Sequence, residues 1–262
     1  MSTFAMHVAK TGLNSQQIKM QVIANNLANV NTTGFKADRA NFESLLYQIL
    51  RGAGDNTSEN TSLTSGLAVG TGTRLLNTSK LHTQGSLINT GNSLDISIEG
   101  DGFFQVLLPD GRVGYTRSGA FSRNAEGMVV TASGYPLQPE ITIPPEALSI
   151  NIASDGIVTV QVPGAVDAEE VGQITLADFP NRQGLQPNGE SMLMESPASG
   201  APIIAAPFEE GMGRTVQGSL ESSNVNVVQE LVDMIETQRA YEVSSKTITS
   251  VDEMMRYLAQ NV

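Results

Sequence analysis

Histidines and clustered carboxylates are the side chains of this chain that could carry acid–base or metal chemistry. His7 and His82 are the only histidines, and neither stands near an acid and a nucleophile that would suggest a catalytic triad. Asp95, Glu99 and Asp101 are closely spaced, but their spacing does not match an EF-hand loop. Cysteine is absent, which removes disulfides and thiolate metal ligands. We therefore expect no catalytic residue, no metal site and no cofactor, and we interpret His82 as a packed or surface residue.

The glycine-rich stretch 66–74 resembles a phosphate-binding loop only superficially. It lacks the Lys-Ser/Thr ending, and no strand–loop–helix pattern surrounds it. Glycines at these positions instead favour an extended crossing or a close contact between backbones. Nucleotide binding is therefore not predicted.

The elements at the two ends of the chain have a helical period. Near the N-terminus two heptad series run in parallel, Met6, Leu13, Met20 and Leu27 together with Ala9, Gln16, Ile23 and Val30. Such an a/d seam predicts a helix packed against another helix. Lys10 and Lys19 are its only charged residues, so more than one face needs cover. Short polar residues and glycine, at Asn29, Asn31 and Gly34, predict its end.

The C-terminal region repeats this pattern. Asn226 is a good N-cap, and Gln229 follows at the spacing of a capping box. The apolar residues recur at sevens: Val227, Met234, Tyr241, Ile248, Met255 and Val262, supported by Leu231, Val251 and Leu258. Both predicted helices are too long for a core of this chain to cover, so each other and neighbouring copies are the expected cover.

The region between the helices has another character. Alternating apolar runs separated by Asp-Gly and Glu-Gly pairs predict hairpins over 94–131 and 148–162, and a single strand over 171–179. Loops are expected over 180–189 and 197–213. Residues 41–50 are predicted to form a short amphipathic helix, and 52–62 a polar loop.

The predicted organisation is α+β: paired, coiled-coil-like terminal helices with a mostly antiparallel β domain, assembling into a helical tube. Residues 1–34 are the N-terminal helix and 216–262 the C-terminal helix of an inner-tube domain. Residues 35–80 are an extended segment that makes contacts between subunits, and 81–215 are the β-rich outer domain.

The chain is acidic. Its net charge is −12, and residues 31–225 carry −11 of this, from 10 basic and 21 acidic side chains. That balance argues against nucleic acid or an anionic membrane as partner. The N-terminus lacks the pattern of a cleaved signal peptide, and no apolar run suffices for membrane insertion.

Three stretches together carry a family resemblance. Near the N-terminus they are 23–30 with Gly34-Phe35-Lys36; in the middle, 84–87, 90–95 and 98–106; near the C-terminus, 224–226, 230–235 and 238–242. In this order they resemble the signatures of flagellar rod and hook proteins. The chain length favours a rod subunit of the distal type, because hook proteins carry an extra outer domain.

The resemblance implies a structural subunit, not an enzyme. It implies a homopolymer that forms a rigid tubular drive shaft with a central export channel, joins proximal rod proteins to the hook protein, and runs inside the P-ring and L-ring proteins. It also implies export by the flagellar type III system to a basal body that spans the periplasm to the outer membrane. The alternatives are another axial subunit, proximal rod or hook, and a soluble enzyme or ligand-binding β protein.

Two sets of residues follow as candidate sites. The expected assembly interface consists of Leu13, Met20, Ile23, Asn25, Asn26, Leu27, Asn29, Val30, Phe35, Leu231, Met234, Gln238, Tyr241, Ile248 and Met255. The expected rod-stiffening segment contains Leu45, Tyr47, Gly66, Gly70 and Gly72.

Overall fold

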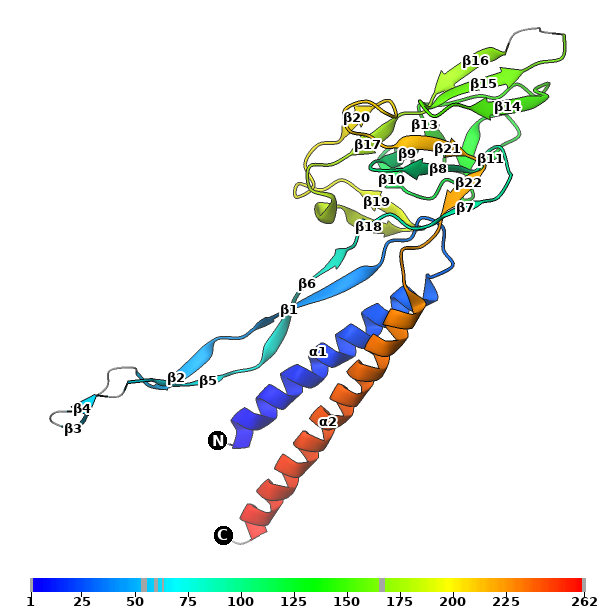
Figure 1. Cartoon of the computed structure of the whole chain (residues 1–262). Coiled ribbons are helices and arrows are strands. Elements are labelled where there is room, and N and C mark those ends of the chain that lie inside the picture. The colour runs from blue at the N-terminus through cyan, green and yellow to red at the C-terminus, as the bar shows by residue number, and fades with distance from the viewer. Residues whose placement is uncertain (1, 53–55, 59–60, 63, 165–167, 261–262) are drawn as a thin grey trace. The chain divides into compact units, whose positions relative to one another are not determined.

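The computed structural model describes residues 2–52, 56–58, 61–62, 64–164 and 168–260. The chain divides into two compact units. The helix-and-arm unit contains Met1–Leu27, Asp38–Ser79 and Asn226–Val262, and the β unit contains Ala28–Ala37 and Lys80–Val225. The α+β class with a helix at each end is confirmed. We describe each unit by itself, and Figure 1 labels their elements.

Two long helices frame the helix-and-arm unit. Helix α1 spans Ser2–Ala28 and α2 spans Val227–Gln260. The predicted end of α1 is confirmed, and Gly34 adopts a φ of 68° soon after it. The Asn226 cap of α2 is also confirmed, because its Oδ1 accepts from the backbone N–H of Val228 and Gln229 at 3.1 and 3.3 Å. The Gln229 side chain donates to Asp233 and does not complete a capping box.

The segment Asp38–Ser79 of this unit, which we call the arm, is built of strands. They are β1 (Asp38–Ser44), β2 (Tyr47–Arg51), β3 (Asn56–Ser58), β4 (Thr61–Ser62), β5 (Leu67–Gly70) and β6 (Thr73–Lys80). They pair as β1 with β6, β2 with β5 and β3 with β4. The prediction of a short helix over 41–50 is wrong. Apolar residues there fit a helical spacing, but pairing such as Tyr47 with Gly70 makes them two strands.

The predicted polar loop over 52–62 is partly strand. Strands β3 and β4 pair within it, and the rest lies largely outside the described residues. The predicted extended crossing at 66–74 is confirmed, since it holds β5 and the start of β6.

The β unit holds the remaining strands and one short 3-10 helix. They are β7 (Leu87–Asn89), β8 (Ile96–Glu99), β9 (Phe103–Leu107), β10 (Val113–Thr116), β11 (Phe121–Arg123), β12 (Val129–Thr131), β13 (Leu137–Gln138), β14 (Ser149–Ile152), β15 (Ile157–Gln161), β16 (Glu169–Gln173), β17 (Leu176–Asp178), η1 (Arg182–Gly184), β18 (Gln186–Gly189), β19 (Met192–Met194), β20 (Ile203–Ala205), β21 (Arg214–Gln217) and β22 (Ser219–Glu221). The largest sheet has the order β18-β19-β10-β9-β17-β20, with β13 also on β9. Its pairings are antiparallel, as predicted.

Three local predictions for this unit are corrected. Residues 171–179 are not one strand, because β16 pairs with β15 while β17 joins the large sheet on β9. Residues 180–189 contain η1 and β18, and 197–213 contain β20. For β17 and β20, pairing with a strand distant in the sequence, which local propensity does not encode, decided the structure.

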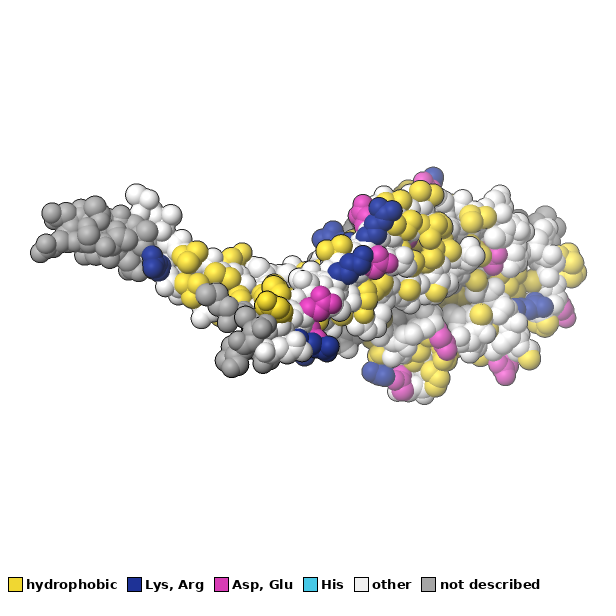
Figure 2. Space-filling model, turned by 90° about the horizontal axis from the view of Figure 1, so that it is seen from below, with side chains coloured by type: hydrophobic (Ala, Val, Ile, Leu, Met, Phe, Trp, Pro, Cys, Tyr) yellow, Lys and Arg dark blue, Asp and Glu magenta, His cyan; other side chains and the backbone are white. Residues whose placement is uncertain are grey.

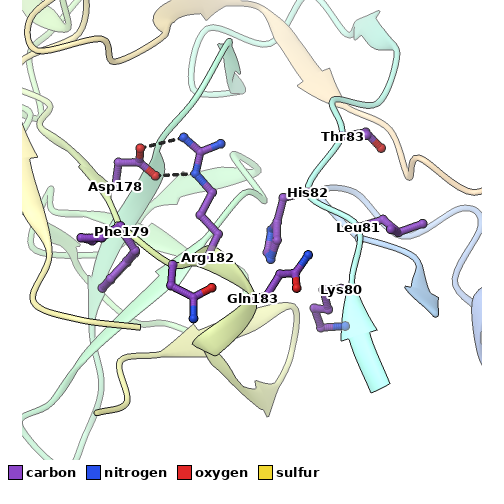
Figure 3. Close-up of a pocket in the computed structure, with 10 residues that line it drawn as sticks. Lys80, Leu81, His82, Thr83, Asp178, Phe179, Arg182 and Gln183 are labelled. Carbon is purple, nitrogen blue, oxygen red and sulfur yellow. Dashed lines mark hydrogen bonds and ion pairs between the residues drawn. The ribbon is translucent and has the colours of Figure 1, made fainter. Parts of the chain in front are cut away.

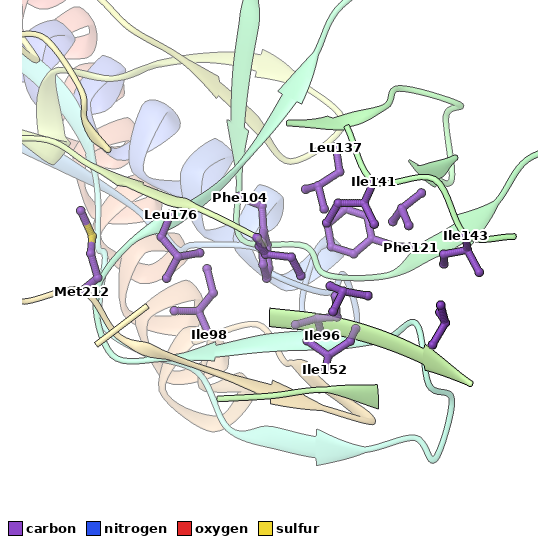
Figure 4. Close-up of a cluster of buried hydrophobic side chains, with 14 residues drawn as sticks. Ile96, Ile98, Phe104, Phe121, Leu137, Ile141, Ile143, Ile152, Leu176 and Met212 are labelled. Carbon is purple, nitrogen blue, oxygen red and sulfur yellow. The ribbon is translucent and has the colours of Figure 1, made fainter. Parts of the chain in front are cut away.

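Alternating apolar residues of the β unit meet in one main core. Phe104, Leu137, Ile143 and Leu176 are each 0 % exposed. Phe104 and Phe121 pack edge to face with ring centroids 5.2 Å apart. Figure 4 shows these side chains converging from several strands. The turns between strands use glycine in the left-handed region, as at Gly127 and Gly156 with φ of 88° and 83°. The β unit thus has a complete core of its own.

Candidate assembly site

The predicted helix seam is present in the helix-and-arm unit. On α1, Ile23 and Asn26 are buried, and Leu13, Met20 and Leu27 are half-buried. On α2 the seam is formed by half-buried Met234, Tyr241, Ser244, Ile248 and Met255 with buried Thr237 and Val251. These positions alternate three and four apart, which is the spacing of a coiled-coil seam.

Asn26 of α1 and Glu230 of α2 form a polar contact between the two helices. Asn26 Nδ2 donates to Glu230 Oε1 at 3.0 Å and to the Asp38 carbonyl at 2.9 Å, while its Oδ1 accepts from the Asp38 N–H at 2.8 Å. Partial burial raises the pKa of the Glu230 carboxyl, and the Asn26 hydrogen bond opposes that rise. The Asn26 carboxamide therefore connects α1 both to α2 and to the first residue of the arm.

Sequence reasoning missed two of the seven residues of the α2 seam. Thr237 and Ser244 are polar, so a count of apolar heptads passes over them. In the structure their hydroxyls donate to the carbonyls of Asp233 and Ala240, at 2.6 and 2.9 Å. With the hydroxyl bonded inside its own helix, each side chain presents a small packing surface. Ser244 lies seven residues before the apolar Val251, and this heptad spacing was the signal that could have identified Ser244 as a seam residue.

Other predicted interface residues are exposed in the single chain. Leu231 is 43 % exposed, and Asn25 and Gln238 are also exposed. Large exposed apolar side chains continue on α2 as Val228, Val232, Ile235, Val243, Met254 and Tyr257. A stripe of this size outside the seam requires a further surface to cover it.

The arm also presents apolar side chains to solvent. Leu46, Tyr47 and Ile49 are 89, 62 and 71 % exposed, and Leu50, Leu67 and Leu76 are more than half exposed. Figure 2 shows hydrophobic side chains along the arm. Of the predicted stiffening residues, Leu45 is half-buried and Gly66 is exposed. Gly70 lies against the Tyr47 ring, and a Cβ at this position would be 3.4 Å from the ring.

Four segments of the β unit meet in a buried ionic cluster, which we call the junction network. Lys36 Nζ donates to Glu221 Oε1 at 2.6 Å and to the Thr83 carbonyl at 2.8 Å. Gly85 N–H also donates to Glu221 Oε1, and Arg117 Nε lies 3.3 Å from Glu221 Oε2. Burial lowers the pKa of Lys36, although the Glu221 carboxylate partly opposes this effect.

Asn224 extends the junction network on the same segments. Its Oδ1 accepts from the Ala37 N–H at 2.8 Å, and its Nδ2 donates to the Leu81 carbonyl at 2.7 Å. Gly34 N–H donates to the Glu221 carbonyl, and a Cβ at Gly34 would lie 2.5 Å from Ser118 N. The residues that follow α1 and those that precede α2 are thereby fixed to the β unit. Sequence analysis named Lys36 and Asn224 only as parts of motifs and missed Glu221 and Arg117.

The remaining predicted residues after α1 lie in the β unit. The Asn29 carbonyl accepts from the Thr32 N–H at 3.1 Å in the turn that follows the helix, and Val30 is half-buried. The Phe35 ring is half-buried, with Lys80 Nζ 5.2 Å from its centroid. These residues shape the exit from α1.

An open cleft of about 760 Å³ lies between 80–83 and 178–183 of the β unit (Figure 3). Arg182 donates to both oxygens of Asp178 at 2.6 and 2.7 Å, and to Asp101. Both ring nitrogens of His82 are buried and have no hydrogen-bond partner among the described residues. Burial first, then the charges of Lys36 and Arg182, lowers the pKa of His82 to about 4.

Within the described residues, no three or more His, Asp or Glu side chains gather to hold a metal ion. Neither described helix has the length and apolarity needed to cross a bilayer. A self-sufficient β unit joined to helices with uncovered apolar surface defines an assembly-forming structural subunit.

Comparison with known proteins specifies the assembly. Residues 6–36 match the family model of flagella basal body rod proteins, 97–160 the flagellar hook protein FlgE/F/G D1 domain, and 216–261 the flagellar basal body rod FlgEFG protein C-terminal region. Flagellar basal-body rod protein FlgG of Buchnera aphidicola from Schizaphis graminum is 51 % identical over 98 % of each chain. FlgG of Agrobacterium fabrum is 44 % identical over 98 % of this chain and 99 % of its own, and FlgG of Bacillus subtilis 36 % over 95 % of each.

This chain belongs to the flagellar basal-body rod protein family. It is therefore a structural component of the flagellar basal body that assembles with other rod and hook proteins.

Proposed function

We propose that the chain is a subunit of the distal rod, a rigid tube that transmits motor torque from the proximal rod to the hook and encloses the export channel. The observation that carries the proposal is full-length similarity to FlgG rod proteins combined with uncovered apolar surface on both α2 and the arm. In a homopolymer these surfaces are covered by neighbouring copies, which gives each subunit several bonds and the tube its stiffness.

The partners follow from this position. We propose proximal rod proteins below, the hook protein above, and the P-ring and L-ring proteins around the shaft, across the periplasm to the outer membrane. The subunit leaves the cell unfolded through the flagellar type III system. The absence of cysteine supports this route, since an unfolded chain in an oxidising compartment then forms no wrong disulfide.

Within the tube, the predicted interface residues and the arm have separate roles. The α1–α2 seam and the exposed stripe of α2 form the inner wall. The arm residues Leu45, Tyr47, Gly66, Gly70 and Gly72 belong to a segment that bridges to a neighbouring subunit and stiffens the rod. The exposed aliphatic side chains of β2 and β5 support this role, because the single chain leaves them without cover.

The test compares two equally exposed aliphatic residues, Ile49 on the arm and Leu148 in the β unit, each 71 % exposed. Ile49→Asp is expected to give unstable or bent rods in electron micrographs of basal bodies, because a charge would be buried between subunits. Leu148→Asp is the matched control and is expected to give normal rods. If Ile49→Asp rods are as straight and stable as those of the control, the arm has no stiffening role.

A further inference from the structure

The arm contacts α1 at a second place, nearer the N-terminus of the helix than the Asn26 contact. Ser15 is buried on α1, and its Oγ lies 3.0 Å from Oγ1 of Thr73 at the start of β6. The backbone N–H of Thr73 donates to Thr11 Oγ1 at 3.4 Å. Both α1 hydroxyls are also held by their own helix, because Thr11 donates to the Val8 carbonyl at 2.8 Å and Ser15 to the Thr11 carbonyl at 2.9 Å.

Gly72 makes this contact possible. Its φ is 119°, a conformation that L side chains rarely adopt. A Cβ built at Gly72 would lie 2.1 Å from Thr11 Oγ1, so the backbone passes directly over the threonine. A side chain larger than hydrogen at this position would have to displace either the Thr11 side chain or the arm.

The contact lies where one pair of arm strands gives way to the next. The Gly72 carbonyl accepts from the Leu45 N–H at 2.9 Å, and Thr71 Oγ1 donates to the Leu46 carbonyl at 2.6 Å. Pairing of β1 with β6 lies on one side, and pairing of β2 with β5 on the other. Both arm strands are therefore held at the point where the exposed β2–β5 hairpin begins.

The arm is thus attached to α1 at two points. The first is Asn26 with Asp38, and the second is Thr11 and Ser15 with Gly72 and Thr73. The helix positions differ by 11 to 15 residues, which corresponds to about 20 Å along the helix axis. Two attachments at that separation fix a direction, whereas one attachment allows the arm to pivot.

We propose that the Thr11–Gly72 contact is a positioning contact, which sets the direction in which β2 and β5 leave α1 and so selects the surface that they reach on a second copy of the chain. This inference rests on the proposed role of the arm between subunits. Thr11 and Ser15 touch no neighbouring subunit in this role. They act through the backbone of residues 71–73.

The test uses the natural absence of cysteine. Cysteines placed at Gln17 on α1 and Gln48 on β2, both exposed, take spin labels in the full-length unassembled chain. Electron–electron double resonance then measures the label separation. The otherwise unchanged chain is expected to give one narrow distance distribution. Thr11→Val with Ser15→Ala, which keeps the shape and removes the hydroxyls, is expected to lower the ratio of attached to detached arms by about fivefold or more.

Gly72→Val is expected to shift the distribution to longer separations. Thr78→Val, at an exposed threonine of β6, is the matched control and is expected to leave the distance distribution unchanged. Identical distributions in the Thr11/Ser15 variant, Gly72→Val and the control would overturn the positioning contact, as would a broad distribution before any of these changes.

The selection of a neighbour needs a second readout. Rods assembled from the Thr11/Ser15 variant are expected to show altered straightness or twist in electron micrographs. If the arm moves in the unassembled chain but the rods are unchanged, the selection is refuted. Normal rods from Ile49→Asp refute instead the arm's role between subunits, and that result is independent of the label separation.

Discussion

The β unit and the helix-and-arm unit bury their apolar side chains to very different degrees. Among the described residues, Ile23 and Val251 are the only buried hydrophobic side chains of the helix-and-arm unit, and the β unit holds all the others. Conversely, 15 of the 20 large exposed hydrophobic side chains belong to the helix-and-arm unit. Because burial of apolar area is the main stabilising term in folding, we expect the β unit to be stable by itself and propose that the helix-and-arm unit gains stability on assembly.

Polar contacts divide in the same way. The β unit contains the junction network, where Glu221 is 1 % exposed and bonded on several sides. In the helix-and-arm unit, short side chains such as Asn26, Thr11 and Ser15 make the polar contacts between elements. One region therefore has a fixed interior, and the other has a set of attachments between elements, which we propose orient surfaces toward neighbouring subunits.

The largest expected effect that separates the two units is loss of assembly without loss of the β fold. Tyr241→Asp places a carboxylate in the half-buried seam of α2, where desolvation without a partner is unfavourable. We expect no rods and no swimming, with the urea transition of the β unit unchanged within about 0.5 kcal/mol.

Tyr241→Phe is the control for that change, because it keeps the ring in the seam and is expected to assemble. Normal motility of the Tyr241→Asp strain would show that the seam does not need neighbours to exclude water from this position.

The next largest effect is a loss of stability of the β unit, whereas the previous substitution affects assembly and leaves the β unit folded. Lys36→Met leaves Glu221 buried with one charged partner fewer, which we expect to cost about 3–5 kcal/mol of unfolding free energy in urea titration of the full-length chain. Lys80→Met, beside the Phe35 ring, is the control, with an expected cost of about 0.5–1 kcal/mol. Equal costs for the two lysines would mean that the junction network does not stabilise the fold.

The smallest effect is a pH dependence of the unfolding free energy of the β unit. His82 has a pKa of about 4 in the folded chain and about 6.5 when unfolded, so below pH 6.5 the unfolded chain binds a proton that the folded chain does not. Stability should fall by roughly 3 kcal/mol as the pH decreases from 6.5 to 4. His82→Phe is expected to remove this part of the slope.

His7→Gln, at the other histidine, is the control for the pH experiment and should keep the full slope in urea titrations at each pH. A slope that is the same in His82→Phe and His7→Gln would show that other groups account for the acid sensitivity.

Much of this protein was predictable from residue pattern alone. The spacing of apolar residues along a helix is a local pattern, so α1 and α2 could be predicted from it. The Asn226 cap could be predicted because a short polar side chain stands at the start of α2. The Asp-Gly and Glu-Gly pairs at Gly111 and Gly127 located hairpin turns because glycine tolerates positive φ. The hairpin expected at Asp101-Gly102 is wrong, because β8 pairs with β21 and β9 pairs with other strands. The motif order also indicated the family.

Only the tertiary structure decided the rest, because it depends on partners far away in the chain. Residues 41–50 became strands through pairing with β5 and β6, and residues 171–179 were divided between two sheets. Lys36, Gly85 and Glu221 look unrelated in sequence, and they meet because three chain segments cross where a buried carboxylate needs donors. The contact of Thr11 with Gly72 depends likewise on a backbone passing over a hydroxyl, which no local pattern encodes.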